Sequence, residues 1–550
     1  MRKPLRLISG SSPFNILFAA GVIMKCATDL LTSMTDTRPR SESRSRRRPA
    51  GASASGTSPR AASYRSLVNP FEPLRVFSDD QVAAIHGAAL GILSRDGMRV
   101  LSARARNAFA AAGAAVEEAS QTVRLDPDLV GTLIRNVPAQ FILQAVNADR
   151  TVHVGGRRVV IAPVGGPPNV SDLERGRRPG SLSALEDFFR MSQAFDVIHL
   201  LSPCVEPQDV PPHERHLDTT FAQLTLSDKL PFVFSRGAAQ IADCFAMLRI
   251  AHRIAEPGFG EKIVCYTVVN TNSPLQLDVA MAEGIMDFAA AGQLVIVTPF
   301  TLAGAMAPVT IVGALTLAHA EALLGICLAQ IVRPGTAVVY GSFTSNVDMK
   351  SGSPAFGTPE YAKAAFGAGQ LARHLHIPWR CSSATAANYP DGQAMYESQM
   401  SLWGALLGGC NILIHGAGWL EGGLTASYEK FILDVEMLQM FAELFRPVSA
   451  DEAEMGLEAI SGVGPGGHFF GAAHTMTRYR DAFYSPLVSD WRNFGAWSEA
   501  GGLTATQRAH ELWKQTLREF RPPQVPAEVR EQLVDFVARR KAEGGAAPPS

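Results

Sequence analysis

Seven short runs of apolar and β-branched residues recur along the chain, and helical patterns separate them. The runs span residues 197–204, 231–236, 263–270, 293–300, 336–343, 377–383 and 411–418. Apolar runs that alternate with amphipathic helices are typical of parallel strands covered by helices. The sequence therefore predicts an α/β fold, a (β/α)8 TIM-type barrel whose eighth strand lies at 159–163 or near Leu457–Val463. A doubly wound open sheet is the alternative, but neither a GxGxxG motif nor a P-loop follows a strand.

The composition changes along the chain and predicts three parts. Residues 1–66 contain a stretch rich in Arg, Ser, Ala and Gly (Arg38–Ser63) with little to bury, so we expect a disordered basic N-terminal arm. Residues 67–150 have helical patterns and form a predicted small N-terminal helical domain. Residues 151–545 form the predicted barrel domain, including a C-terminal extension.

Local signals within these parts are more specific. Asp79 and Ser102 are candidate helix caps, and Pro127 is placed near a helix start. The stretch Thr151–Pro163 alternates apolar with other residues around Gly-Gly, which indicates a β-hairpin.

An apolar segment near the N-terminus bears on location. Pro13–Met24 follows basic residues as the apolar part of a signal peptide does, but no clear small-residue cleavage site follows it. It is shorter than the about 20 apolar residues that a membrane span needs. Met34 is an alternative start. We predict a cytoplasmic protein without a membrane partner.

Charge and cysteine content narrow the function classes. A formal net charge of -1 over 550 residues argues against nucleic acid as the main partner of the folded body. None of the 7 cysteines forms a CxxC pair, and their neighbours are apolar. We therefore expect reduced, buried thiols.

In a barrel the active site lies at the carboxyl ends of the strands, which selects the residues just after each run. Aromatic side chains there are candidates to bind a quaternary ammonium by cation–π attraction, although aromatics more often fill the core. Asp348, His415 and Glu421 are candidate catalytic groups. A capping carboxylate or a core histidine is the plainer interpretation of each. The candidate substrate-binding residues are Tyr340, Phe356, Trp379, Ala384, Asn388, Tyr389 and Trp419.

Histidines also occur in a Gly-rich stretch, GPGGHFFGAAHT. His468 and His474 are six residues apart there and could contact the tail of a bulky cofactor. No third ligand is apparent nearby, so we predict no metal site.

Several motifs in order resemble the trimethylamine–corrinoid methyltransferase family. They are VYGSFTSNVDMKSGSPAFGTPE, YPDGQAMYES, GGCNILIHGAGWLEGGLTASYEKFILDVEML, GGHFFGAAHT and PLVSDWRNF. The resemblance covers about Asn69–Gly545. It implies a (β/α)8 barrel that moves a methyl group from a methylated amine to the Co(I) form of a corrinoid. That corrinoid (cobalamin) belongs to a separate small corrinoid-binding protein, so the chain would hold no tightly bound cofactor of its own.

The resemblance has one departure. Archaeal trimethylamine enzymes of the family carry pyrrolysine shortly before a Pro-Asp-x-Gln, where this chain has Ala384, within about one residue. Ala offers no electrophilic imine, so the chain resembles the non-pyrrolysine branch that demethylates quaternary amines such as glycine betaine. A quaternary ammonium already carries the charge that makes its amine a leaving group. A corrinoid-independent enzyme on another methylated amine and a quaternary-amine sensor are the alternatives. Association with further copies of the chain stays open.

Overall fold

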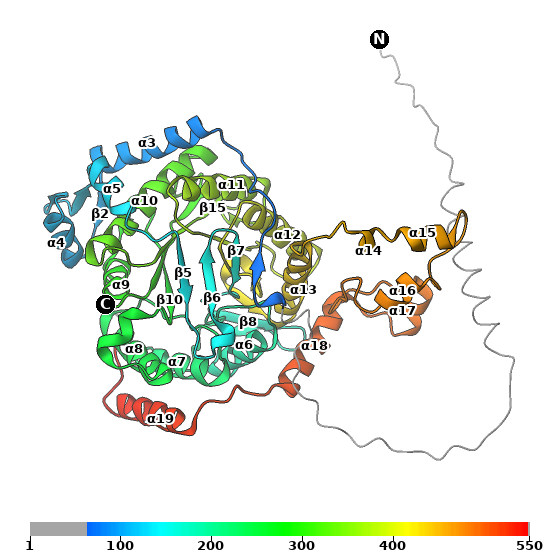
Figure 1. Ribbon diagram of the computed structural model, residues 1–550. Helices are drawn as coiled ribbons and strands as arrows, with labels where there is room; N and C mark the ends of the chain where they lie inside the picture. The colour runs from blue at the N-terminus through cyan, green and yellow to red at the C-terminus, as the bar shows by residue number, and fades with distance from the viewer. Residues whose placement is uncertain (1–62, 548–550) are drawn as a thin grey trace, which may run out of the picture. The chain divides into compact units, whose positions relative to one another are not determined.

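The computed structural model describes residues 63–547 (Figure 1). Pro13–Met24, Met34 and most of the predicted basic arm lie outside the described residues. The end of that arm, residues 63–66, is folded. Tyr64 is buried, and His199 Nε2 lies 2.8 Å from its carbonyl oxygen. The packed chain therefore begins earlier than the sequence indicated.

The central sheet has seven strands in the order β1-β7-β18-β17-β14-β12-β10. Every neighbouring pair is parallel except β1 with β7. Its strands are β1 (Leu67–Val68), β7 (Arg158–Ile161), β10 (Tyr266–Val269), β12 (Leu294–Val297), β14 (Val338–Gly341), β17 (Trp379–Ser382) and β18 (Ile412–Ile414).

The position of the predicted eighth strand is settled in favour of 159–163, where β7 pairs with β18. The alternative at Leu457–Val463 is wrong, because those residues form helix α15. Leu457 and Ile460 are exposed there, so the apolar residues that suggested a strand do not enter the sheet.

Two predicted strand runs appear as single parallel bridges. Leu200 pairs with Leu230, and Phe232 pairs with Tyr266 of β10. The backbone N–H of His199 also donates to the carbonyl oxygen of Ile161 in β7, at 2.8 Å. The runs at 197–204 and 231–236 thus link β7 to β10.

One helix follows each strand or bridge in turn, and Figure 1 shows these helices around the strands. They are α6 (Leu182–Ala194), α7 (Arg215–Leu226), α8 (Ala238–His252), α9 (Val279–Ala290), α10 (Ile311–Val332), α11 (Pro359–His374), α12 (Gly392–Leu407) and α13 (Tyr428–Leu444). Within residues 63–547, only α10 is long and apolar enough to cross a membrane by length and composition. Most of it is buried inside the protein, as is typical of a core helix.

The two faces of the sheet pack into two separate apolar groups. Alternate strand residues such as Ile296, Val339 and Ile412 belong to one group, which we call the inner face. Their strand neighbours, such as Val338, point the other way, to what we call the outer face, and pack with the covering helices. Side chains alternate along a strand, so consecutive residues of one strand lie on opposite faces of the sheet.

The N-terminal part confirms the predicted helices, with additions. Ser78, rather than Asp79, caps α3, while Ser102 caps α4 and Pro127 is the first residue of α5. Short strands lie among these helices and were not predicted, and β2 pairs with β11 from the segment before α9. These elements are α3 (Asp79–Arg95), β2 (Met98–Val100), α4 (Ala103–Ala111), β3 (Ala115–Glu117), β4 (Thr122–Arg124), α5 (Pro127–Ile134) and β11 (Gln276–Leu277).

The predicted hairpin at Thr151–Pro163 is a pair of strands that separate. β6 pairs with β5, whereas β7 joins the central sheet. The remaining strands form small separate sheets. They are β5 (Gln140–Leu143), β6 (Val152–Gly155), β8 (Asn169–Asp172), β9 (Gly176–Pro179), β13 (Phe300–Ala303), β15 (Phe343–Val347), β16 (Pro354–Ala355), β19 (Trp419–Leu420) and β20 (Thr425–Ser427).

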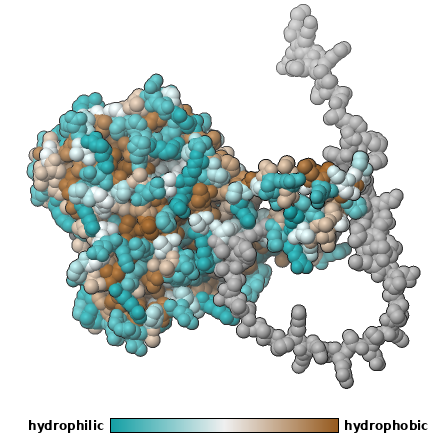
Figure 2. All heavy atoms as spheres, in the orientation of Figure 1, coloured by the Kyte–Doolittle hydropathy of each residue, from teal (hydrophilic) through white to brown (hydrophobic). Residues whose placement is uncertain are grey.

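The C-terminal extension is a series of helices. They are α14 (Glu452–Met455), α15 (Leu457–Val463), α16 (Ala473–Arg478), α17 (Phe494–Glu499), α18 (Ala505–Glu519) and α19 (Ala527–Ala542). Three short 3-10 helices lie earlier in the chain: η1 (Ala148–Arg150), η2 (Glu256–Glu261) and η3 (Glu421–Gly423). Figure 2 shows apolar atoms at the surface of the α14–α15 stretch. Large apolar side chains exposed across this part include Val448, Leu457, Ile460, Phe470, Phe483, Trp491 and Phe494.

The described cysteines bear out the prediction from their neighbours. Cys204, Cys244, Cys265, Cys327, Cys381 and Cys410 are all free and buried. Cys26 lies outside the described residues.

Candidate functional site

Five rings meet beyond the carboxyl ends of β14, β17 and β18. We call Phe343, Phe356, Tyr361, His415 and Trp419 the aromatic cluster. Phe356 stacks on Phe343 with ring centroids 5.3 Å apart, and the Trp419 ring meets both phenylalanines edge-on. His415 lies closest to Trp419, at 4.4 Å between centroids. Trp419 is only 6% exposed, so the faces of these rings are shielded from water.

Backbone contacts fix the loop that carries Trp419. Its indole N–H donates to the carbonyl oxygen of Thr385 at 2.9 Å. The backbone N–H of Glu421 donates to Ala387 O at 2.8 Å. The loop after β17 and the loop after β18 are therefore joined, and the Trp419 ring is held in one orientation.

Glu397 of α12 organises the loop after β17. Its carboxylate accepts hydrogen bonds from the backbone N–H groups of Ala386 and Ala387, at 2.9 and 3.2 Å, and from the Thr385 hydroxyl. The Gln393 amide donates to the other carboxylate oxygen at 2.9 Å. The irregular stretch before the Pro-Asp-Gly-Gln segment thus wraps around a carboxylate, which satisfies backbone donors that have no strand partner.

The His415 side chain is uncharged near neutral pH. Burial, and then the nearby Arg380 charge, lower the pKa of His415 well below its ordinary value. Its Nδ1 accepts a hydrogen bond from the backbone N–H of Gly165 at 3.3 Å. The ring is a neutral, flat member of the aromatic cluster, and the proton sits on Nε2.

The structure places Tyr340 and Trp379 away from the aromatic cluster. Both lie on the outer face and pack against helices. The Tyr340 hydroxyl is 3.0 Å from His319 Nδ1 of α10. Gly369 and Gly408 make room for the Trp379 ring, because a Cβ at either position would lie 2.9 or 3.0 Å from it. These two rings therefore fill the space between sheet and helices.

The substrate-binding candidates on the loop after β17 differ in exposure. Ala384 is fully buried, and its carbonyl oxygen accepts from the Ser401 hydroxyl at 2.7 Å. Asn388 and Tyr389 are exposed, with Tyr389 at 55%. Phe356 and Trp419 are thus the predicted aromatics that the structure brings together.

Both candidate carboxylates have structural partners. Asp348 is exposed and closes the turn between β15 and β16, where it accepts from the Ser351 hydroxyl at 2.7 Å. Glu421 forms an ion pair with Arg177, with Nε and Oε2 2.8 Å apart. Burial alone would raise the pKa of Glu421, but Arg177 and Thr425 together lower it. Glu421 therefore stays ionised and partnered.

His468 and His474 lie on the exposed C-terminal extension. His468 is exposed, and His474 Nε2 is 3.2 Å from the carbonyl oxygen of Ala453. Between residues 63 and 547, no group of three His, Cys, Asp or Glu side chains is arranged to hold a metal ion.

Sequence reasoning left out two residues that shape the site. Glu397 organises a loop, and Arg380 carries a buried charge beside Phe343, the aromatic residue at the centre of the cluster. Arg380 had a usable signal, because it is the one charged residue in the strand IPWRCSS. A charge inside an apolar strand has to meet a specific partner or ligand.

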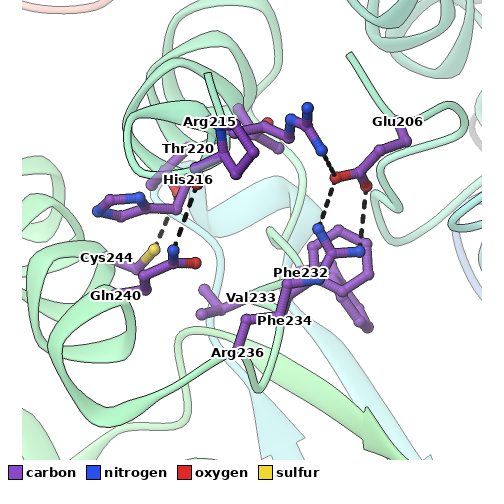
Figure 3. A pocket seen from close by; sticks show the side chains of 12 residues that line it. Glu206, Arg215, His216, Thr220, Phe232, Val233, Phe234, Arg236, Gln240 and Cys244 are labelled. Atoms are coloured by element: carbon purple, nitrogen blue, oxygen red, sulfur yellow. Dashed lines mark hydrogen bonds and ion pairs between the residues drawn. The ribbon is translucent and has the colours of Figure 1, made fainter. Parts of the chain in front are cut away.

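A cavity of about 180 Å³ lies elsewhere on the same side of the sheet, between the end of the 231–236 run and helices α7 and α8. Figure 3 shows Glu206 held there by the guanidinium groups of Arg215 and Arg236, at 2.7 and 2.6 Å. The Arg236 guanidinium also covers the Phe234 ring, 4.0 Å from its centroid. Two arginines for one carboxylate make this cavity unsuited to a cation.

Comparison with known proteins gives the class. A family model described as trimethylamine methyltransferase (MTTB) matches residues 41–545. The chain belongs to this methyltransferase family. It is 35% identical over 472 residues to the glycine betaine methyltransferase of Desulfitobacterium hafniense (strain Y51), covering 86% of this chain and 98% of that protein. Trimethylamine methyltransferase MttB from D. hafniense (strain DSM 10664 / DCB-2) is 28% identical, with 86% and 95% covered.

Two further similarities lie at or below 28% identity. Trimethylamine methyltransferase MttB1 of Methanosarcina mazei is 28% identical over 446 residues, with 80% of this chain and 89% of that protein covered. The crystal structure of the Methanosarcina barkeri monomethylamine methyltransferase (MtmB) aligns with a TM-score of 0.47 at 12% identity, covering 86% of this chain and 89% of that one.

Proposed function

We propose that this methyltransferase moves a methyl group from a quaternary amine of the betaine type to the corrinoid of a separate small protein. The aromatic cluster carries the proposal. It offers shielded ring faces and no free carboxylate, which suits a diffuse cation without N–H donors. The relative that acts on glycine betaine, and Ala384 in place of a reactive side chain, support the same class of substrate.

The chain's own residues would bind, orient and exclude water. Trp419 and Phe356, which lie in contact, would lie against the ammonium, and neutral His415 would add no repulsive charge. Transfer from a quaternary amine needs no proton, so a charged acid or base beside the substrate is unnecessary. The corrinoid supplies the nucleophile that accepts the methyl group.

We further propose that the central strands close into a (β/α)8 barrel. The bridges Leu200–Leu230 and Phe232–Tyr266 continue the parallel order from β7 to β10. With them, eight parallel segments each precede a helix, in the order α6 to α13. In a closed barrel the aromatic cluster would lie at the catalytic end.

The acceptor protein has to reach the aromatic cluster from outside. We propose a cytoplasmic enzyme whose exposed C-terminal extension, with His468 and His474, lies within reach of that corrinoid protein. Asp348, Asn388 and Tyr389 are exposed on the loops after the strands and stay candidates for contacts around the entrance.

The direct test is spectroscopic. Purified chain, reduced Co(I) corrinoid and glycine betaine should give methyl-Co(III), whereas trimethylamine should give little. Absence of conversion with every quaternary amine, together with tight betaine binding, would identify a sensor instead.

Replacing Trp419 should weaken glycine betaine binding about tenfold, since a desolvated cation–π contact contributes roughly 0.5–2 kcal/mol. Calorimetric titration of Trp419→Leu measures this. Trp379→Leu is the matched control, because that ring lies on the outer face: it should lower the free energy of unfolding and leave the dissociation constant unchanged. Equal losses of affinity in both variants would remove the aromatic cluster as the ammonium site.

The same site should discriminate between methylation states. A protonated dimethylamine keeps hydrogen-bonded water that the rings cannot replace, so glycine betaine should bind at least about tenfold tighter than dimethylglycine. Titration of the two ligands at one pH is the measurement. A preference for dimethylglycine would show that carboxylate contacts dominate recognition.

A further inference from the structure

Arg380 carries a charge that has no counter-ion in the part of the chain that the structure describes. It pairs with Gly341 of β14 and Ile412 of β18, so it points to the inner face, opposite to Trp379. Arg380 is 2% exposed. Among the described residues, its Nη1 donates a hydrogen bond to the carbonyl oxygen of Ser342 at 3.4 Å, and its Nε has no partner. A buried guanidinium is costly unless an anion meets it.

Two hydroxyls on the same face are also without a partner among residues 63–547. They are Ser382 Oγ, two residues along β17, and Thr298 Oγ1, directly after β12. Gly341 lies between Thr298 and Arg380. A Cβ there would lie 2.0 Å from Thr298 Oγ1, so only glycine leaves room for the Thr298 hydroxyl. Three buried polar groups on neighbouring strands thus have atoms without a hydrogen-bond partner among the described residues.

This polar group adjoins the aromatic cluster. The Arg380 Cζ is 5.6 Å from the centroid of the Phe343 ring. A fixed positive charge so close repels a simple cation, but it complements a molecule that carries a carboxylate a few atoms from its ammonium. Recognition of a carboxylate by arginine is also geometrically favourable, because the guanidinium can donate two parallel hydrogen bonds.

We propose that Arg380, with Thr298 and Ser382, holds the carboxylate of the betaine while its ammonium lies against the aromatic cluster. Arg380 is then the residue that selects carboxylate-bearing quaternary amines over choline and other plain cations. This assignment rests on the proposed function, and it makes the carboxylate the part of the substrate that is recognised.

The test is calorimetric titration of the full chain, without corrinoid, using glycine betaine and choline. The unmodified chain should bind glycine betaine at least about 30-fold tighter than choline, the range that charge-assisted hydrogen bonds give. Arg380→Met should weaken betaine binding by a similar factor and leave choline binding unchanged or tighter. Equal loss of both ligands in a folded Arg380→Met would overturn the assignment.

A milder variant protects the test against a failure of Arg380→Met to fold. Thr298→Val keeps the shape and removes one hydroxyl, so betaine should bind roughly 3- to 10-fold weaker with choline unaffected. Unchanged betaine affinity in both Thr298→Val and Ser382→Ala would also overturn the assignment. An unmodified chain that binds betaine and choline equally refutes the role of Arg380 alone, whereas one that binds neither refutes the proposed function.

Discussion

Lys430→Met should destabilise the protein by about 3–5 kcal/mol, the cost of leaving one member of a buried ion pair without its partner. Lys430 and Asp434 form an ion pair one helical turn apart on α13, and both are buried. Lys430 Nζ also donates to Ser398 Oγ at 2.9 Å. Removing the ammonium leaves the Asp434 charge in an apolar interior. Equilibrium unfolding in urea measures the change.

The same substitution should also disturb the candidate site. Asp434 Oδ2 accepts from the backbone N–H of Gly418 at 2.8 Å, and Gly418 precedes Trp419. We therefore expect Lys430→Met to weaken betaine binding as well as stability. The double variant Lys430→Met/Asp434→Asn removes both charges and should recover most of the stability. A loss below about 1 kcal/mol in the single variant would mean that Asp434 is protonated or solvated after the change.

Acidification from pH 7.5 to pH 5 should lower the free energy of unfolding by several kcal/mol. Burial lowers the pKa of His199 and of His252 to about 4, and it lowers the pKa of His319 and His415 well below the ordinary value. Histidines in the unfolded chain become protonated near pH 6.5, whereas these buried histidines stay neutral in the folded protein. Below pH 6.5 the unfolded state therefore binds more protons than the folded state and is stabilised relative to it. Each such histidine costs about 2 kcal/mol between pH 6.5 and 5.

Buried carboxyl groups oppose this trend in part. Burial raises the pKa of Asp187 and Glu321, and a group of this kind contributes stability at low pH that is lost as the pH rises. A single-residue comparison separates the histidine contribution. His199→Gln should reduce the difference between pH 7.5 and pH 5 by about 2 kcal/mol relative to the unmodified protein. Identical pH dependence in the variant and the unmodified protein would show that burial does not lower the pKa of His199.

Most strands of the central sheet and two of the helix starts were predictable because their signals are local. Ser102 and Pro127 lie where their hydrogen bonding and fixed φ suit a helix start. Leu457–Val463 misled because a short apolar run fits a strand or a helix equally well, and exposure is invisible in sequence.

The sequence indicated the neighbourhood of the candidate site but not the side on which each residue points. Tyr340 lies inside β14 and Trp379 is the first residue of β17, and both are on the outer face. A parallel sheet buried on both faces shows no alternation between apolar and polar residues, so the pattern gives no sign of facing. Phe343 belongs to the aromatic cluster because it begins β15, a separate short strand that follows β14. The change from β14 to β15 depends on the path of the backbone, which the residue types do not show.

Side chains alternate along β17, so the residues that pack against helices and the residues that face the proposed ligand can be substituted separately. Residues 379 and 381 pack against helices, while residues 380 and 382 point to the inner face. A library confined to 380 and 382, together with Thr298, would vary ligand preference without disturbing the layer that holds the sheet to its helices. An insertion or deletion of one residue before Trp379 would do the opposite, because it would exchange the two sets of side chains at once. We therefore expect substitutions at these positions to change ligand preference at a smaller cost in stability than an insertion or a deletion.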